Sequence, residues 1–537
     1  MSDSAPSKPK RRWYRLTPDR FLVGMLLGVF LLLLAARFDV WGLSFGGGWN
    51  VVFAIGLVVV GVLVGLLWYA ISLLLGLRFQ FGVRTLLLLT LVVAIVCSWF
   101  AVRMNYAGRQ RAAVVAVEVA GGSIRYHDIR NHNYSGDGEV NGDEELPGPA
   151  WLHRLVGTDF LADVVWLDSQ AIFSQEAPPK VDDNWLDLHV DGLIYVQVMD
   201  LSGTAISNTG VELLGKLTDL ERLALIDTQV TDVGAEHLKK LRNLQQLVVA
   251  DTRISDAGVA HVAELTNLKF LDLSGTQITD VGLNYVERLQ KVESLHLSDT
   301  RVGDEGLAHL EGLTMLKYLD LSRTQVTGNG FRHLRECRNL EGILFEDVPV
   351  TDAGLKHLKG LTRLKNLLLH DTEVTDAGLQ YLQELTRLER LFLNNTQITD
   401  AGLEHLRGLS NLESLRLGNT AVSDKRLAQL KDMSNLGFID LTGTQVTGTG
   451  LKHLQGLPEL SQLALDGSQL NDAGLEILKT LTNLGIVTLS RTGITDAGLV
   501  HLEEMTMLST LDLTETAVSD QGVEKLRKAL PSCQIDH

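Results

Sequence analysis

Residues 220–235 have the sequence LERLALIDTQVTDVGA, and this spacing of leucine, threonine, aspartate and glycine returns every 24 residues. The threonine position recurs fourteen times from Thr204 to Thr516, and only Val348 and Ser468 replace the threonine. A strict period of this length is typical of a solenoid, in which each repeat stacks on the next. The sequence therefore predicts one solenoid over residues 181–537, closed by a final strand-like segment at residues 529–535.

Each repeat, called a coil below, combines the spacing of a strand with that of a helix. In the coil around Thr228, Leu223 and Leu225 alternate as in a half-buried strand, whereas Leu238 and Leu241 recur at a helical interval. A unit of this size cannot bury both apolar faces alone, so neighbouring coils must share one core. We expect an α/β solenoid with a parallel sheet on the concave face and helices on the convex face.

Aspartate and glycine mark the predicted start of each helix. Thr231 and Asp232 stand where the helix begins, so one of them should accept a hydrogen bond from a free backbone N–H. The recurring aspartates could also suggest a calcium ladder, but one carboxylate per coil falls far short of the six to eight oxygen ligands that calcium requires. No metal site is predicted. Gly234 lies in the first helical turn, where we expect close contact between coils to require it.

Two other polar columns follow the period, a column being the same position in successive coils. Eight histidines share one such position, between His237 and His501. Neighbouring members would lie about 4.8 Å apart, a spacing that could suit zinc or proton transfer. Because a buried apolar residue follows each histidine, we predict residues on the flank of the helix instead. The threonine of the motif is expected to bond the backbone of the next coil.

The first 102 residues are predicted to lie in a membrane. A basic cytoplasmic segment, residues 1–20, precedes apolar runs at residues 21–36, 51–76 and 85–102. The second and third runs are long enough to span a bilayer, whereas the first spans only if flanking residues snorkel or the bilayer thins. Lysine and arginine in the short loops number eight on the N-terminal side and four on the other. This bias places the repeats outside the cytoplasm, and loss of the first span would reverse the orientation.

Residues 103–180 are predicted to form a juxtamembrane segment and N-terminal cap. A helix is expected over residues 104–120 and a strand over residues 123–127. Residues 131–149 are rich in Asn, Gly and acidic side chains and are predicted to form a loop. The helix-then-strand pattern of residues 151–167 is expected to cover the open end of the solenoid core.

Composition and motifs argue against several classes of function. The formal net charge is −17, and residues 1–103 hold ten basic against three acidic side chains, so the rest of the chain carries a formal −24 and should repel nucleic acid and anionic lipid. Three scattered cysteines form no disulfide framework. We find no metalloprotease, phosphate-loop, hydrolase or kinase motif, and the period already accounts for the serine, histidine and aspartate positions. We predict a protein that is not an enzyme and has no cofactor.

The repeats resemble those of the leucine-rich-repeat superfamily, and the turn ITDAGL is similar to a subclass also seen in F-box proteins and bacterial effectors. The sequence FGVRTLLLLT at residues 81–90, together with residues 108–111 and 121–123, resembles membrane-anchored leucine-rich-repeat proteins of planctomycete bacteria. This resemblance implies a horseshoe or arc whose concave sheet binds protein ligands. It implies no particular ligand, and no F-box is present.

Candidate binding residues stand where the strands depart from the period. The position between the two strand leucines is polar in many coils, as at Asp272 and Asp320. In three successive coils it is apolar, and arginine, histidine and asparagine surround it: Leu344, Leu368, Phe392, Arg390, Arg416, His370 and Asn394. Exposed apolar residues with such a rim are typical of an interface core, although drift on a tolerant surface would give the same pattern. A second, more scattered strip comprises Phe270, Tyr318 and Phe438.

These features predict a membrane-anchored protein-binding scaffold or receptor-like protein with a protein partner. Two alternatives remain open at this stage. The first is a structural envelope protein whose repeats pack against copies of themselves. The second is an anchored subunit that recruits an enzyme.

Overall fold

The computed structural model describes residues 83–119, 122–126, 164–168 and 181–537. The chain divides into two compact units. The first includes residues 187–198 together with everything before Lys180, and the second comprises Lys180–Leu186 and Met199–His537.

The first unit contains a long helix and a small antiparallel pair of strands. Helix α3 (Val83–Val119) is followed by β1 (Ser123–Tyr126), which pairs with β2 (Val164–Asp168). The helix predicted over residues 104–120 and the strand predicted over residues 123–127 are confirmed, although the helix begins earlier. Further along, α6 (Asp183–His189) leads into the 3-10 helix η3 (Val190–Gly192). The Tyr106 hydroxyl of α3 donates to the carbonyl oxygen of Gly192 at 3.2 Å.

Helix α3 contains the segment predicted as the third membrane span, residues 85–102. Among the described helices, none has both the length and the apolar composition that a bilayer span requires. The predicted spans at residues 21–36 and 51–76 and the predicted loop at residues 131–149 lie outside the described residues. Most of the predicted cap also lies outside them.

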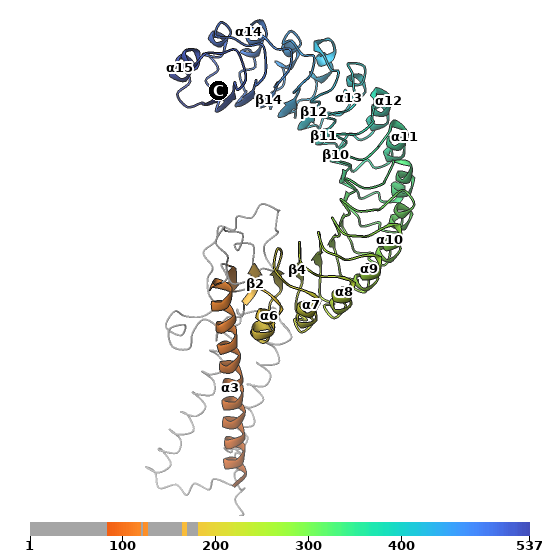
Figure 1. Ribbon diagram of the computed structural model, residues 1–537, viewed down its shortest axis with the longest axis vertical. Helices are drawn as coiled ribbons and strands as arrows, with labels where there is room; N and C mark the ends of the chain where they lie inside the picture. The colour runs from red at the N-terminus through yellow and green to blue at the C-terminus, as the bar shows by residue number, and fades with distance from the viewer. Residues whose placement is uncertain (1–82, 120–121, 127–163, 169–180) are drawn as a thin grey trace, which may run out of the picture. The chain divides into compact units, whose positions relative to one another are not determined.

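The second unit is a solenoid with one three-residue strand in each coil. The strands are β3 (Val198–Asp200), β4 (Arg222–Ala224), β5 (Gln246–Val248), β6 (Phe270–Asp272), β7 (Ser294–His296), β8 (Tyr318–Asp320), β9 (Gly342–Leu344), β10 (Asn366–Leu368), β11 (Arg390–Phe392), β12 (Ser414–Arg416), β13 (Phe438–Asp440), β14 (Gln462–Ala464), β15 (Ile486–Thr488), β16 (Thr510–Asp512) and β17 (Gln534–Asp536). From β4 onward each strand pairs in parallel with the next, so the predicted parallel sheet and the closing strand are confirmed. Figure 1 shows this sheet on the inner side of the arc that the solenoid forms.

The outer side of the arc carries short helices of two kinds. The α-helices are α7 (Asn208–Leu214), α8 (Asp232–Leu238), α9 (Asp256–Val262), α10 (Asp280–Val286), α11 (Asp352–Leu355), α12 (Asp376–Leu379), α13 (Leu403–Leu406), α14 (Asp472–Leu478) and α15 (Asp520–Ala529). The 3-10 helices are η4 (Gly306–Leu310), η5 (Asn329–Glu336), η6 (Lys356–Leu358), η7 (Gln380–Leu382), η8 (Asp424–Leu430), η9 (Leu451–Leu454) and η10 (Leu499–His501). The sequence predicted helices without this distinction. Leucines three residues apart suit the three-residue turn of a 3-10 helix.

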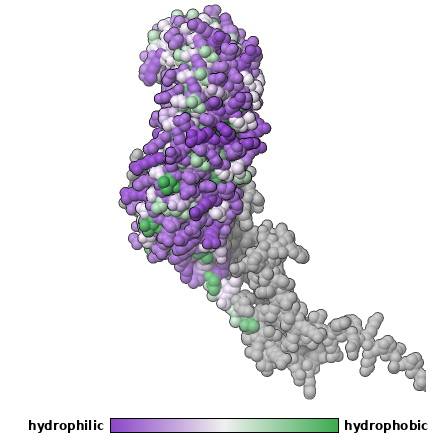
Figure 2. All heavy atoms as spheres, turned by 90° about the vertical axis from the view of Figure 1, so that its right-hand side faces the viewer, coloured by the Kyte–Doolittle hydropathy of each residue, from purple (hydrophilic) through white to green (hydrophobic). Residues whose placement is uncertain are grey.

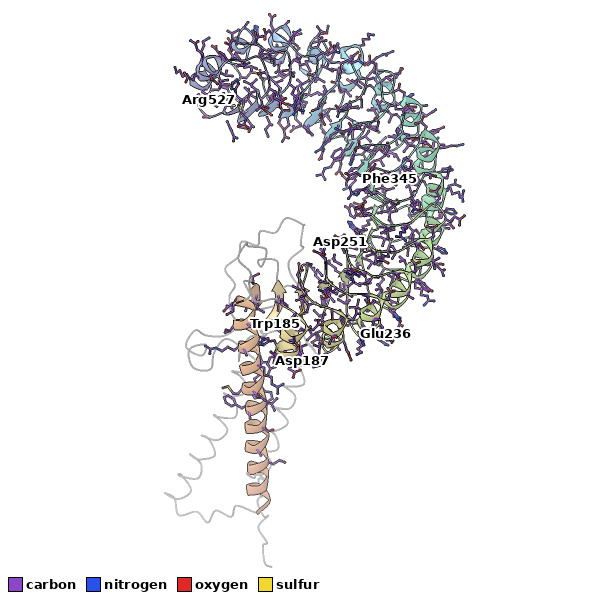
Figure 3. The ribbon with its side chains drawn as sticks, in the orientation of Figure 1. Trp185, Asp187, Glu236, Asp251, Phe345 and Arg527 are labelled. Carbon is purple, nitrogen blue, oxygen red and sulfur yellow. The ribbon has the colours of Figure 1, made fainter. Side chains whose placement is uncertain are left out.

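The core lies between the sheet and these helices. In β11 and just after it, Leu391 and Leu393 are both fully buried. Phe331 and Phe345 stack with their ring centroids 4.4 Å apart, and Figure 3 shows Phe345 between the sheet and the outer helices. Cys337 takes the place of a core leucine, and burial raises the pKa of its thiol to about 12. Figure 2 views the helical side, where hydrophilic residues predominate and apolar ones are scattered.

Hydrogen bonds between the helix starts join one coil to the next. The Thr231 side chain accepts from the N–H of Val233, which confirms that one residue of the Thr-Asp pair caps the helix. Asp232 has a different role from the predicted cap, because its carboxylate accepts from the backbone N–H (2.7 Å) and the hydroxyl (2.6 Å) of Ser255 in the following coil. A Cβ on Gly258 would lie 2.5 Å from this carboxylate. The predicted close contact at the glycine column is therefore confirmed.

Asp424 forms the same kind of bridge to the following coil, but its carboxylate accepts hydrogen bonds from more donors. Burial of its carboxyl group favours a higher pKa, but hydrogen bonds from Thr447, Gly450 and Thr449 outweigh this effect and lower the pKa. The Gly450 N–H and the Thr449 hydroxyl both lie 2.9 Å from the carboxylate. The bridge therefore holds a charged carboxylate that several donors from the next coil compensate.

Glycine replaces the bridging aspartate at two places, Gly328 and Gly448, which lie 120 residues apart. Gly328 has a φ of +90°, and a Cβ on it would come within 3.0 Å of the Gly354 Cα in the next coil. Thr351, which precedes that next helix, makes no side-chain cap. At these two junctions between coils, direct packing of one backbone on the next replaces the hydrogen-bonded bridge.

The threonine column does not bond the next coil, contrary to prediction. The Thr228 hydroxyl donates to the carbonyl oxygen of Leu225 in its own coil at 2.7 Å, because its short side chain reaches only the turn that precedes it. Immediately before this column, the backbone is left-handed in every coil from Gly203 to Glu515. The non-glycine members of this column, which the sequence analysis missed, are Asp227, Asp251, Asp299, Arg323, Asp347, Asp371, Asn395, Asn419, Arg491 and Glu515, with φ between 52° and 58°.

Candidate protein-binding groove on the concave sheet

The three residues of each strand divide between the core and the concave face. In β11 the middle residue, Leu391, is buried, whereas Arg390 is exposed and Phe392 is half-buried. The parallel register places the first residues of successive strands in one column and the third residues in another. Solvent-facing side chains of neighbouring coils therefore lie side by side, as predicted for this face.

A groove with a volume of about 470 Å³ crosses the concave face from β8 to β12. The first-residue column contributes Tyr318, Gly342, Asn366, Arg390 and Ser414 to its lining. The third-residue column contributes Leu344, Leu368, Phe392 and Arg416. We call this feature the concave groove. It brings together five of the seven residues predicted for the main patch.

The apolar side chains at the base of the concave groove are less accessible than predicted. Leu344, Leu368 and Phe392 are half-buried rather than fully exposed. Neighbouring side chains in the column shield one another, and the guanidinium of Arg416 lies 4.2 Å from the centroid of the Phe392 ring. A contact of this kind stabilises a cation on an aromatic face and holds the arginine in place.

The three residues of the second predicted strip do not lie together. Tyr318 and Phe438 lie at the two ends of the groove, whereas Phe270 lies elsewhere. Tyr318 lines the groove and is 40% exposed. Its ring fits because Gly342 has no side chain, and a Cβ there would lie 2.8 Å from the Tyr318 ring. Phe438 lies beyond β12, with its ring 5.5 Å from the Arg416 guanidinium. Phe270 lies outside the groove, beside His296, at a ring distance of 5.0 Å.

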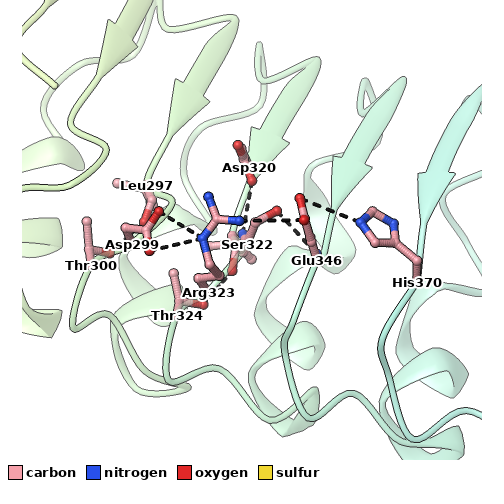
Figure 4. Close-up of polar contacts among 10 residues, drawn as sticks. Leu297, Asp299, Thr300, Asp320, Ser322, Arg323, Thr324, Glu346 and His370 are labelled. Atoms are coloured by element: carbon pink, nitrogen blue, oxygen red, sulfur yellow. Dashed lines mark hydrogen bonds and ion pairs between the residues drawn. The ribbon is translucent and has the colours of Figure 1, made fainter. Parts of the chain in front are cut away.

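His370, predicted to lie beside the apolar residues of the patch, is not part of the lining of the concave groove. Figure 4 shows it at the end of a row of charged residues beside the strands. Arg323 pairs with Asp299 at 2.9 Å and with Glu346 at 3.5 Å. His370 Nε2 lies 3.5 Å from the other oxygen of Glu346, and its Nδ1 is buried without a hydrogen-bond partner. The histidine thus faces an acidic residue of its own column in the preceding coil rather than the groove.

Asn394 is also absent from the lining. Its side-chain amide donates to the Asp440 carboxylate at 2.6 Å, two strands away. Asp440 is only 9% exposed and accepts a second hydrogen bond, from the backbone N–H of Thr442 at 2.9 Å. Asn394 therefore fixes a buried carboxylate at one end of the groove.

Asn366 lines the concave groove but was not predicted. Its side-chain oxygen is buried and has no hydrogen-bond partner. The sequence signal was available, because Asn366 is in register with Gly342 and Arg390 on the neighbouring strands. A column-by-column comparison of strand residues would have found it.

The histidine column lies on the helix flank, as predicted. His333 Nδ1 lies 2.5 Å from Glu311, and His309 Nδ1 lies 3.6 Å from Glu287. Within the part of the chain that the structure describes, no group of three or more histidine, cysteine, aspartate or glutamate residues could hold a metal ion. The groove itself places apolar, cationic and amide groups side by side.

Comparison with known proteins identifies the class of the solenoid. Residues 254–474 match the family described as a leucine-rich repeat region, and residues 504–526 match a leucine-rich repeat. Over these residues the solenoid is therefore built of leucine-rich repeats. No curated protein matches the sequence.

Several solved structures are similar to this chain. An internalin (inlF) from Listeria monocytogenes is 26% identical with a TM-score of 0.49, over 61% of this chain and 88% of that one. A leucine-rich-repeat protein of Leptospira interrogans is 21% identical with a TM-score of 0.49, over 64% and 91%. The ectodomain of the membrane receptor kinase GASSHO1/SCHENGEN3 from Arabidopsis thaliana, in complex with CASPARIAN STRIP INTEGRITY FACTOR 2, is 18% identical with a TM-score of 0.43, over 70% and 50%.

Proposed function

We propose that this protein is a membrane-anchored, non-enzymatic scaffold or receptor-like protein that binds a protein partner in the concave groove. One observation carries the proposal. Three apolar side chains occupy adjacent positions of a column that is polar in many other coils, and they line a groove together with two arginines. Apolar residues with an arginine rim are typical of the energetic centre of protein interfaces.

The change Phe392→Asp tests the partner-binding part of this proposal. We expect it to reduce recovery of the partner at least tenfold when the full-length protein is crosslinked and purified from its native envelope, because truncating a central aromatic anchor costs about 2 kcal/mol or more. Val248→Asp is the matched control, since Val248 is a half-buried third residue of β5, outside the groove. Equal recovery with both variants would refute the groove as the binding site. Recovery of the same chain alone would favour self-packing.

The anchor is proposed from the three apolar runs before residue 103, and the excess of positive residues near the N-terminus orients them. A reporter fused after His537 that is active only in the cytoplasm is therefore expected to stay silent. The same fusion without residues 1–102 should become active and serves as the control. Strong activity of the full-length fusion would mean that the first segment does not span or that the orientation is reversed.

A further inference from the structure

The concave groove concentrates positive charge on an acidic protein. The chain has a formal net charge of −17, yet two exposed arginines, Arg390 and Arg416, line one groove. Cations at the neighbouring coil edges are paired, as in Lys317–Glu293 at 2.6 Å and Lys365–Glu389 at 3.4 Å. Among the described residues, neither groove arginine has a carboxylate within 4.0 Å, whereas Arg416 contacts two aromatic rings.

The nearest acidic residue in the Arg416 column does not neutralise it. Asp440 is in register with Arg416 on the next strand. Its carboxylate is almost fully buried and accepts hydrogen bonds from Asn394 and from the backbone of Thr442. The two arginines therefore remain available to an acidic group from outside.

The arginines also lie within reach of one another. Arg390 is a first residue on β11, and Arg416 is a third residue on β12, so the two are diagonal neighbours. Strands about 4.8 Å apart, with about 3.3 Å per residue, place their Cα atoms about 8 Å from each other. Side chains as long as arginine can hold one carboxylate between them at this separation, with strong charge-assisted hydrogen bonds.

We infer that the concave groove binds an extended acidic peptide segment of the partner. An aspartate or glutamate of that segment lies between Arg390 and Arg416. An apolar side chain of the segment packs on Leu344 and Leu368. This inference rests on the proposed function and adds the chemistry of the ligand to it.

The length of the groove sets the length of the segment. From β8 to β12 there are four strand spacings, or about 19 Å, which an extended chain covers with about six residues. Hexapeptides are therefore suitable probes.

The test measures binding of the full-length protein to an array of hexapeptides that carry one Asp or Glu beside one Leu or Phe. The matched array replaces each acid by its amide, Asn or Gln. We expect the acidic peptides to bind roughly ten- to hundredfold more tightly, because hydrogen bonds to charged groups contribute more than neutral ones. This preference should disappear in the double variant Arg390→Gln and Arg416→Gln. Arg301→Gln, an exposed arginine outside the groove, should retain it.

The outcomes separate this inference from the proposed function. A preference for acids that survives in the double variant overturns the inference. Peptides that bind equally as acids and amides, and lose binding with Phe392→Asp, also overturn it but leave the groove as a protein-binding site. If inorganic phosphate competes as strongly as the acidic peptides do, the ligand of the groove is a simple anion rather than a peptide. Failure of all peptides to bind would count against both.

Discussion

Replacing Leu393 by aspartate is expected to unfold several coils, whereas the same change at Phe392 should alter the free energy of unfolding by about 1 kcal/mol or less. Leu393 is fully buried between the sheet and the outer helices, so an aspartate there places a carboxylate in the core without a partner. We expect a loss of about 4 kcal/mol or more, which is at the upper end for single substitutions. Phe392 is half-buried on the concave face, where water and Arg416 can reach a carboxylate.

Thermal melts of the two variants beside the unchanged protein would measure this difference. Leu391→Asp is a useful second core variant, because Leu391 is fully buried on the other side of Phe392. The expected order of melting temperatures has both leucine variants well below Phe392→Asp. If Phe392→Asp melts as early as Leu393→Asp, the orientation of the strand is wrong, and the proposed groove does not exist in that form.

Gly354→Ala is expected to destabilise the solenoid by about 1–3 kcal/mol, as overpacking of a tight contact does. At this step Gly328 replaces the bridging aspartate, and the two backbones touch. A Cβ on Gly354 would lie 2.8 Å from the Gly328 Cα, and backbone cannot move aside as a flexible side chain can. Relief would require the two coils to separate.

Gly360→Ala is the matched control for this contact. It lies six residues later in the same coil, and a Cβ there would meet no atom within 4 Å. We expect no loss of stability, or a gain of about 0.4–1 kcal/mol from the reduced freedom of the unfolded chain. Urea unfolding of both variants gives the two free energies. A similar stability for both variants would show that the Gly328–Gly354 contact relaxes without cost.

The solenoid was predictable because regularly spaced apolar residues define its 24-residue period. Leucines such as Leu223 and Leu238 define the strand and the helix of a coil, and a parallel sheet is the arrangement that stacks them. The polar columns were less predictable, because sequence alone does not say in which coil a hydrogen-bond partner lies. Asp232 bonds the next coil and Thr228 bonds its own, the reverse of the expected roles. Left-handed backbone at Asp227 does have a signal in residue type, because every member of that column except Arg323, Arg491 and Glu515 is glycine, aspartate or asparagine.

The groove was predictable in part for a similar reason. Leu344, Leu368 and Phe392 were identified because they are apolar at a position that is polar in many other coils. The register of the strands confirmed that they are adjacent. His370 and Asn394 are polar residues near the same strands, but each is engaged by an acidic residue of another coil. Such pairing depends on side-chain directions that the sequence does not specify. The role of the groove residues in binding stays a prediction.

The bridge between helix starts has a consequence for how such a gene can change. Apart from the coils of Gly328 and Gly448, a coil with the bridging aspartate supplies an acceptor to the coil after it and donors to the coil before it, so a copied coil brings both halves of its own junction. Duplication or deletion of whole coils leaves every remaining junction intact, whereas any other change of length breaks the register. The sequences TQVTGNG at residues 324–330 and TQVTGTG at residues 444–450 are what copying of a five-coil block would leave. The length of the arc can thus change by whole coils without loss of these junctions.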